Sequence, residues 1–365
     1  MSTLIDHYVL VPLFLTFLAV LPLGSYASRH IERPACINSL LLVQLAGLST
    51  FFVFFGGYSI DAWRYLTRFT HNPLGFDEEW LFWLTGNFLS GTLPNPWPVK
   101  VLSAFAVALW IWAVIRVISF KSKETLVVAL ALLPLIPAFF FTMGNAVRQG
   151  LASVIVLHAM VFLLARRKWQ FGLAGAAGIL VHLPSAVFVL ASAGMRIPRK
   201  ALWAFLIVSP CVSFGVSFVL EFWQVNLADY IRYAHRDDGQ LHYLKFAFYF
   251  LVSIGLLIFS SKRPVPEYLI SLINVFVITV GFALMLLRYE VPFERILLYA
   301  DVLLPIIFAM VIAELKLGIK TKRFLWSGVV CAGLLLWTSG AVKHTLTAGL
   351  AHLEDGRIEL YQIPN

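Results

Sequence analysis

The sequence predicts an all-α protein that crosses a lipid bilayer many times. Of its 365 residues, 60% are hydrophobic and only 13% are charged. Runs of about twenty apolar residues recur along the chain, and short loops bearing lysine and arginine separate them. Its 31 Phe, 11 Trp and 12 Tyr residues suit lipid-facing surfaces and interfacial belts. We therefore expect about ten transmembrane helices in a single integral membrane domain covering residues 1–365.

The apolar runs mark where these helices should lie. They fall near residues 8–26, 38–56, 99–117, 125–141, 147–165, 171–194, 201–220, 244–260, 268–287, 296–314 and 324–342. The loop "SRHIERP" after the first run is basic while the N-terminus is not, which places the N-terminus outside and this loop in the cytoplasm.

The run at 171–194 either crosses the membrane once or turns back at His182 to Pro184 as a re-entrant helical hairpin. Only the hairpin places the basic loops "SSKRP" and "KLGIKTKR" in the cytoplasm, and it places more of the 28 Lys and Arg residues there. We adopt the re-entrant hairpin. Both termini are then outside, together with outer loops near residues 57–98, 221–243 and 288–295.

The charge and the motifs exclude several classes of protein. The net charge of +9 is spread through the loops, so no nucleic-acid partner is expected. The sequence has no HExxH, Walker, GxSxG or paired CxxC pattern, and we expect no bound metal ion and no cofactor. The acidic stretch "FDEEW", which contains Asp77 and Glu79, could accept a proton from a hydroxyl, bind a divalent cation or simply be solvated.

A cluster of polar residues opens the apolar run at 147–165. Asn145, Arg148 and Gln149 have i, i+3 and i+4 spacing, so they share one face of a helix start. Free N–H groups, the positive end of the helix dipole and a guanidinium together favour binding of a phosphate or pyrophosphate. The alternative is that Arg148 only extends toward lipid headgroups.

A second polar cluster lies at "LRYEVPFERILLYAD". Arg288 ends one helix and Arg295 begins the next, and Arg295 and Tyr299 are i, i+4 neighbours that can face one cavity. The same segment contains three acidic residues: Glu290, Glu294 and Asp301. The two glutamates could neutralise the arginines, and we expect Asp301 to pair with another helix.

The sequence of the first outer loop predicts two short amphipathic segments. Asp61 and Tyr65 share a face, as do Arg64 and Arg68, and the tryptophans there, such as Trp83, could anchor the interface or stack on sugars. His182, at the tip of the hairpin, is either a hydrogen-bonded structural group or a functional one.

These elements together resemble one known family. They are D-x3-Y (Asp61, Tyr65), an acidic residue before an aromatic run (Asp77 to Trp80), N-x2-R-Q (Asn145, Arg148, Gln149), a histidine turn ending in Ser-Ala (His182, Ser185, Ala186) and R-x3-Y (Arg295, Tyr299). In this order they resemble the EpsG-type, Wzy-like polymerases of bacterial exopolysaccharide and O-antigen assembly. The family usually has Gly-Phe where this chain has Glu79-Trp80, and Phe-His where it has Val181-His182.

The resemblance implies a glycosyltransferase of the GT-C type in the bacterial inner membrane, with its active site facing the periplasm. Such enzymes transfer a growing glycan from undecaprenyl pyrophosphate to the non-reducing end of a lipid-linked repeat unit. Because the sequence has no recognised metal-ligand spacing, we expect this transfer to be independent of metal ions. A chain-length regulator of the pathway is a further expected partner. The catalytic base would be His182, Asp61 or Asp77. The substrate-binding residues would be Asn145, Arg148, Gln149, Arg288, Arg295, Tyr299, Tyr65 and Arg64.

Two other classes of function stay open from the sequence. A transporter or flippase for lipid-linked sugars would also use outward arginines and broken helices. A ligase-type or acyl transferase could share the same outer arginine site.

Overall fold

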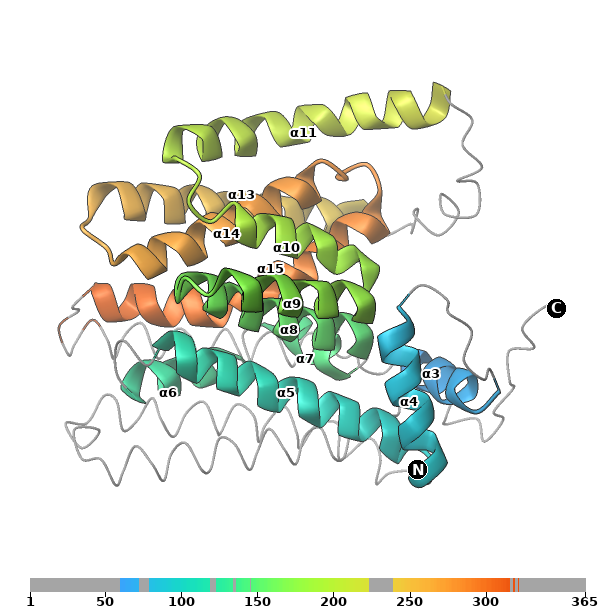
Figure 1. The fold of residues 1–365 in the computed structure, drawn as a ribbon. Coiled ribbons are helices and arrows are strands. Elements are labelled where there is room, and N and C mark those ends of the chain that lie inside the picture. The colour runs from blue at the N-terminus through green and yellow to red at the C-terminus, as the bar shows by residue number, and fades with distance from the viewer. Residues whose placement is uncertain are drawn as a thin grey trace. The chain divides into compact units, whose positions relative to one another are not determined.

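The computed structural model describes residues 60–71, 79–118, 123–133, 136–144, 146–222 and 239–315, with the single positions 318 and 321. Within these ranges every regular element is a helix (Figure 1), as predicted. Five of the described helices are long and apolar enough to cross a membrane. The runs predicted at 8–26, 38–56 and 324–342 lie outside the described residues, so the expected number of about ten spans stays a prediction.

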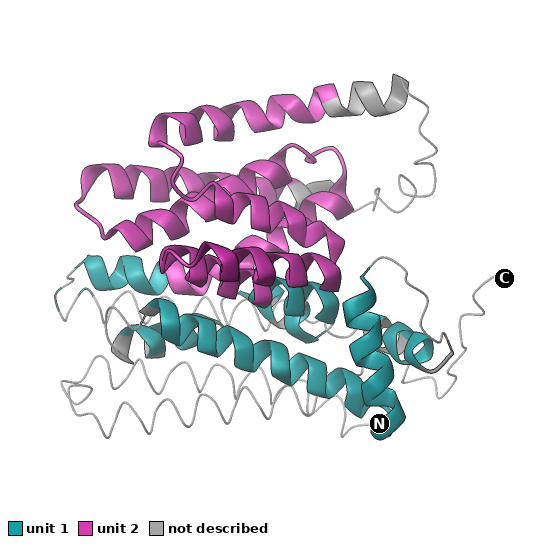
Figure 2. Ribbon diagram, viewed as in Figure 1, with its two compact units in different colours: residues 1–154, 308–365 teal, residues 155–307 magenta. Residues whose placement is uncertain are grey.

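The chain divides into two compact units, which are residues 1–154 with 308–365 and residues 155–307 (Figure 2). The first unit contains α3 (Ile60–His71), α4 (Trp80–Thr92), α5 (Trp97–Ile118), α6 (Lys123–Leu132), α7 (Pro137–Gly144) and the start of α8 (Val147–Leu164). The second contains the rest of α8, then α9 (Lys168–Val181), η3 (Leu183–Ser185), α10 (Ala186–Ala193), α11 (Arg199–Phe222), α13 (Gly239–Lys262), α14 (Glu267–Leu284) and most of α15 (Glu290–Glu314).

In the first unit, α3 and α4 are the two short segments that the sequence predicts for the first outer loop. Only α3 is amphipathic, because α4 is apolar nearly all round and exposes Leu84 and Phe88. The two helices pack closely where the ring of Phe69 lies over Gly86, a position at which any Cβ would collide with that ring. The glycine therefore sets how near α3 approaches α4.

The run predicted at 125–141 is divided into α6 and α7. Pro137 is the first residue of α7, where proline fits because its missing N–H has no helical partner. Trp110 of α5 packs edge-on against Phe139 of α7 with ring centroids 4.9 Å apart, which joins these helices into one core.

In the second unit, α14 is the central helix and is buried along most of its length. It packs against α10, α11 and α13. The side-chain amide of Asn274 donates to the carbonyls of Met195 (2.9 Å) and Ile197 (3.2 Å), in the connection between α10 and α11. This polar residue in the middle of an apolar helix thus satisfies backbone groups that have no partner within a helix.

The run at 171–194 is broken at His182, as the hairpin predicts. The last helical bond of α9 joins the His182 N–H to the Gly178 carbonyl, and the Ser185 N–H then bonds to the His182 carbonyl (2.9 Å). Pro184 has no N–H with which to continue α9. A Cβ placed on Gly175 would lie 3.2 Å from Val189, so α9 and α10 fold back against each other. The position of this turn relative to a bilayer stays a prediction.

Candidate functional site

Arg148 lies in the first turn of α8, where the sequence predicts it. The helix begins close to α7, because a Cβ on Gly150 would lie only 2.6 Å from the carbonyl oxygen of Thr142. Gly150 therefore permits a near contact between two backbones that any larger residue would force apart. This packing holds the start of α8, and with it the Arg148 side chain, against its neighbours in the first unit.

The guanidinium of Arg148 forms an ion pair with the carboxylate of Glu79 through Nη1. Both side chains are largely buried, with 27% of Arg148 and 10% of Glu79 exposed. Glu79 comes directly before α4 and has a left-handed backbone, with φ of 70° and ψ of 28°. This conformation is uncommon for a residue with a side chain and marks a strained position. A buried arginine is thus neutralised by a carboxylate that a strained turn presents.

Aromatic rings surround this ion pair. The Arg148 Cζ atom lies 5.4 Å from the Tyr65 ring centroid and 5.2 Å from that of Trp83. The two rings meet edge to face, with centroids 6.0 Å apart. A second cation, Arg68, lies 4.1 Å from the Trp83 centroid. Trp83 therefore interacts with two guanidiniums through its ring, an arrangement that favours cation binding over the sugar stacking considered from the sequence.

Two buried N–H donors of this cluster have no hydrogen-bond partner. They are Nε of Arg148 and Nε1 of Trp83. A buried donor without an acceptor is costly, and native proteins satisfy nearly all such groups. The Arg148 cluster, which we define as Arg148, Glu79, Tyr65, Trp83 and Arg68, is therefore rich in positive charge and in donors, with Glu79 as its carboxylate.

Tyr65 lies at the centre of the cluster and is buried. Burial raises the pKa of its hydroxyl from 10.0 to about 12, and the nearby Arg148 charge lowers it only in part. The hydroxyl is therefore neutral across the physiological pH range and can donate a hydrogen bond to an anion.

The other residues predicted near Arg148 have different surroundings. Gln149 is buried, and its backbone carbonyl accepts a hydrogen bond from the Ser153 hydroxyl (2.6 Å). Asp61 and Arg64 pair with each other across one turn of α3 at 3.6 Å, with 63% of the Arg64 side chain exposed. Asn145 and Asp77 lie outside the described residues, so their roles stay predictions.

In the second unit, the histidine hairpin lies against α15. The His182 side chain is buried, and six residues later Phe188 packs on Tyr299 with ring centroids 5.6 Å apart. Tyr299 is fully buried, whereas Arg295 is exposed one turn earlier on α15. The structure thus brings the hairpin and Tyr299 together, while the shared role predicted for Arg295 and Tyr299 stays a prediction.

The prediction that Arg288 ends a helix and Arg295 begins the next was wrong, because α14 ends at Leu284 and α15 begins at Glu290. Arg295 lies inside α15, and Arg288 belongs to the turn between the two helices. Its backbone N–H donates to the Ser213 hydroxyl of α11 (3.1 Å), and its guanidinium lies 5.7 Å from the Phe214 ring. Its exposed side chain extends over α11. Arg288 and Arg295 are in the second unit and Arg148 is in the first, so a joint action of these arginines on one ligand stays a prediction.

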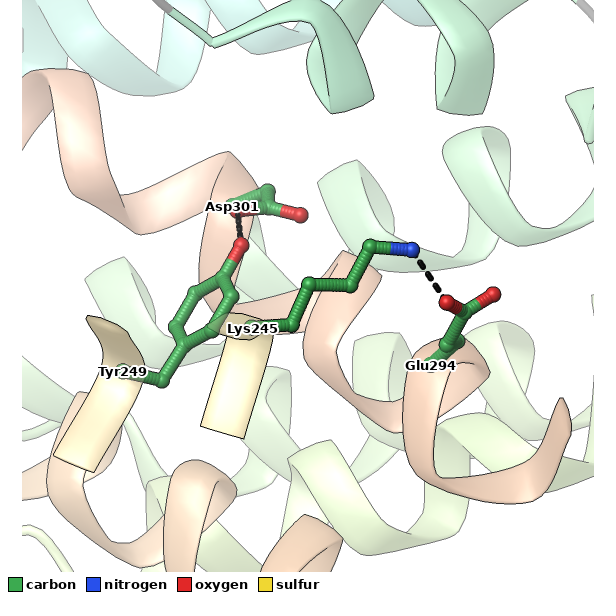
Figure 3. A network of polar contacts seen from close by, with 4 residues as sticks. All are labelled: Lys245, Tyr249, Glu294 and Asp301. Atoms are coloured by element: carbon green, nitrogen blue, oxygen red, sulfur yellow. Dashed lines mark hydrogen bonds and ion pairs between the residues drawn. The ribbon is translucent and has the colours of Figure 1, made fainter. Parts of the chain in front are cut away.

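Two polar contacts join α13 to α15 (Figure 3). Lys245 forms an ion pair with Glu294, and the Tyr249 hydroxyl donates to the Asp301 carboxylate. Asp301 therefore pairs with another helix, as predicted. Glu294 pairs with Lys245, a partner on another helix that the sequence did not indicate. Neutralisation of Arg288 and Arg295 by the glutamates of their own segment stays a prediction.

Three members of the cluster were not assigned to the site from the sequence: Glu79, Trp83 and Arg68. Glu79 was one of three acidic residues with several possible roles, and its partner is 69 residues away. The usable signal was charge balance, because a near-membrane arginine requires a counter-ion. No group of three or more His, Cys, Asp or Glu residues that could hold a metal ion occurs in the described part of the chain.

A comparison with protein families decides the affiliation of the chain. The model of the EpsG family matches residues 5–349, which is nearly the whole sequence. The chain belongs to the EpsG family. No curated protein and no solved structure matches it. Membership of the EpsG family indicates a polysaccharide polymerase, and its association with polysaccharide biosynthesis is consistent with glycosyltransferase activity. The apolar helices agree with a multi-pass membrane protein that meets a lipid-linked substrate.

Proposed function

We propose that this EpsG-family protein polymerises a lipid-linked repeat unit at the periplasmic face of the bacterial inner membrane. It would transfer the growing glycan from undecaprenyl pyrophosphate to the non-reducing end of the next repeat unit. The observation that carries the proposal is the buried Arg148 guanidinium at the start of α8, which has a donor without a partner and lies among Tyr65, Trp83 and Arg68.

The chemistry of the transfer calls for such a cluster. An acceptor hydroxyl oxygen forms a bond to the anomeric carbon of the donor, and the bond from that carbon to the pyrophosphate oxygen breaks. Negative charge grows on the pyrophosphate, so donors fixed in a poorly hydrated site stabilise the transition state. Arg148 would bind this group, with the neutral Tyr65 hydroxyl as a further donor.

The hydroxyl proton must pass to a base as the new bond forms. His182 is our first candidate, because the turn between α9 and α10 holds it at a fixed place. Asp61 and Asp77 are the alternatives. Metal independence and the GT-C type belong to the same proposal, as do the contributions of Asn145, Gln149, Arg288, Arg295 and Tyr299 to substrate binding.

The deciding experiment supplies purified protein with lipid-linked repeat units, without ATP or a nucleotide sugar. A ladder of polymers supports the proposal. A single transfer to another acceptor would indicate a ligase-type transferase, and no covalent change would indicate transport. Addition of a chelator should leave the ladder intact, and loss of the ladder with rescue by magnesium would contradict metal independence.

The periplasmic orientation has a separate test. A cysteine introduced at Gly239, the first residue of α13, in a background without native cysteines should react with an impermeant maleimide in cells whose outer membrane has been permeabilised. Gln362 provides a second labelling position. Labelling only after lysis of the inner membrane would overturn the orientation and the re-entrant hairpin with it.

A further inference from the structure

Glu79 occupies the place on Arg148 where the anion of the proposed function would bind. Its carboxylate contacts Nη1, while Nε of the same guanidinium and Nε1 of the adjacent Trp83 have no acceptor. The ion pair with Glu79 therefore leaves one N–H of Arg148 and the indole N–H of Trp83 without hydrogen-bond acceptors. An anion with more oxygens than a carboxylate could accept hydrogen bonds from these two N–H groups, which Glu79 does not contact.

The backbone of Glu79, which places its carboxylate against Arg148, is strained. The residue has a left-handed φ of 70°, and no side-chain cap joins it to the helix that it precedes. A residue other than glycine keeps such a conformation only where its surroundings enforce it, and here the ion pair with Arg148 is a visible restraint. Breaking the ion pair would remove this restraint, which makes the carboxylate suited to exchange.

We propose that Glu79 is a displaceable counter-ion, which neutralises Arg148 in the empty site and gives way when a diphosphate binds. This inference rests on the proposed function, in which Arg148 binds the pyrophosphate of the donor. The diphosphate accepts from Arg148 Nε and from Trp83 Nε1 and carries more negative charge than one carboxylate. Arg68, beside Trp83, adds a second cation to the same cluster.

The exchange has a consequence for turnover. A free buried arginine would hold pyrophosphate tightly and release it slowly after the glycan has moved. The returning Glu79 carboxylate competes for the same guanidinium and promotes release of undecaprenyl pyrophosphate. Glu79 is in this sense a positioning residue for Arg148 and takes no proton from the acceptor.

The test measures binding of inorganic pyrophosphate to the full chain in nanodiscs of zwitterionic lipid, by calorimetry. We expect Glu79→Gln to bind pyrophosphate at least about tenfold more tightly than the wild type, since one hydrogen-bonded charge no longer competes. Glu267→Gln removes an equal charge from the exposed start of α14 and should leave the affinity unchanged. Equal or weaker binding by Glu79→Gln would overturn the proposal.

Two further variants identify the groups involved. The gain should vanish in Glu79→Gln combined with Arg148→Ala, and it should shrink several-fold with Trp83→Phe, which keeps the ring and removes the donor. If Glu79→Gln does not fold, Glu79→Asp keeps the charge on a shorter side chain and should show a smaller gain. Inorganic phosphate should bind Glu79→Gln at least about tenfold more weakly than pyrophosphate, and equal binding would overturn the assignment to a diphosphate.

The binding measurement needs no catalytic turnover, so it fails separately from the proposed function. If Glu79→Gln binds pyrophosphate more tightly but the protein makes no polymer, the proposed polymerase function is contradicted and the role of Glu79 as a counter-ion is supported. If the protein is an active polymerase but Glu79→Gln changes neither its pyrophosphate affinity nor its product inhibition, only the counter-ion role of Glu79 is contradicted.

Discussion

The Tyr249 hydroxyl of α13 donates a hydrogen bond to the Asp301 carboxylate of α15. Asp301 is 1% exposed and lies within a helix apolar enough to span a membrane. One turn before Tyr249, Lys245 pairs with Glu294, so both contacts join the same two helices (Figure 3). A carboxylate buried to this extent requires a partner, because burial of a charge without one is costly. The two contacts fix the register of α15, the helix that also carries Arg295 and Tyr299.

The first prediction concerns this register. Tyr249→Phe should destabilise the protein by about 1–3 kcal/mol, because it leaves Asp301 buried without its donor. Thermal unfolding in detergent provides the measurement. Tyr243→Phe, which removes a hydroxyl from a tyrosine on the same helix that is 65% exposed, is the matched control and should lower the melting temperature less than Tyr249→Phe does. Equal melting temperatures for wild type and Tyr249→Phe would show that the hydrogen bond has no net effect on stability.

The second prediction concerns the approach of α3 to α4. In Gly86→Ala the new methyl group would collide with the Phe69 ring, which must move and carry α3 with it. Tyr65 is one turn before Phe69, so the variant should lose polymerisation activity as well as stability. Gly91→Ala on the same helix is the control, since nothing lies within 4 Å of a Cβ there. Similar behaviour of the two variants would contradict this packing.

The third prediction follows from the raised pKa of Tyr65. Unfolding returns the phenol from a pKa of about 12 to 10.0, so the unfolded chain releases this proton at lower pH than the folded chain. The contribution of the neutral phenol to stability is therefore complete below pH 10 and declines as the pH rises toward 12. Tyr65→Phe cannot lose this contribution. The difference in the free energy of unfolding between wild type and Tyr65→Phe should shift in favour of the variant by about 1.4 kcal/mol between pH 9 and pH 11, and melting temperatures across this range would follow the shift. A constant difference would mean that Tyr65 titrates normally.

The sequence was sufficient for some of these features and not for others. Apolar length located most of the described helices, although the run at 125–141 is divided into α6 and α7. The spacing of Arg148 and Gln149 correctly placed them at the start of α8. Proline and histidine at 182–184 predicted the turn between α9 and α10. These signals are local, so they can be read without knowledge of tertiary packing.

Partners across helices could not be predicted in the same way. Arg148 required an anion, but nothing local distinguishes Glu79 from its acidic neighbours. Similarly, Asp301 was expected to pair with another helix, while the choice of Tyr249 depends on how α13 lies against α15. The left-handed backbone at Glu79 gives a physical reason for the glycine that the family pattern usually has there, because glycine adopts this conformation without strain.

The fourth prediction tests the base. His182→Ala protein at normal abundance should lose most of its polymerisation activity, because proton removal from the acceptor by a positioned side chain contributes about two to four powers of ten in rate. The assay compares initial rates of polymer formation at matched amounts of folded protein. The exposed Arg167→Ala, before α9, serves as a control on the same hairpin and should retain full activity. A near wild-type rate for His182→Ala would move the assignment to Asp61 or Asp77.

The last prediction concerns why an apolar helix begins with an arginine. If Arg148 binds pyrophosphate through its planar fork, Arg148→Lys keeps the charge but loses the paired donors, including Nε. Its polymerisation rate should fall by about two to three powers of ten, as for the loss of one fixed donor in a site shielded from water. Arg148→Ala should fall at least as far.

An arginine that only extends toward lipid headgroups would tolerate lysine, because lysine extends in the same way. Arg196→Lys, an exposed arginine in the connection between α10 and α11, is the matched control, and we expect it to be fully active. Folding is checked by the melting temperature, since lysine can still pair with Glu79. A wild-type rate for Arg148→Lys would assign the pyrophosphate to Arg288 or to Arg68 instead, because those guanidiniums would then be the ones whose geometry the reaction requires.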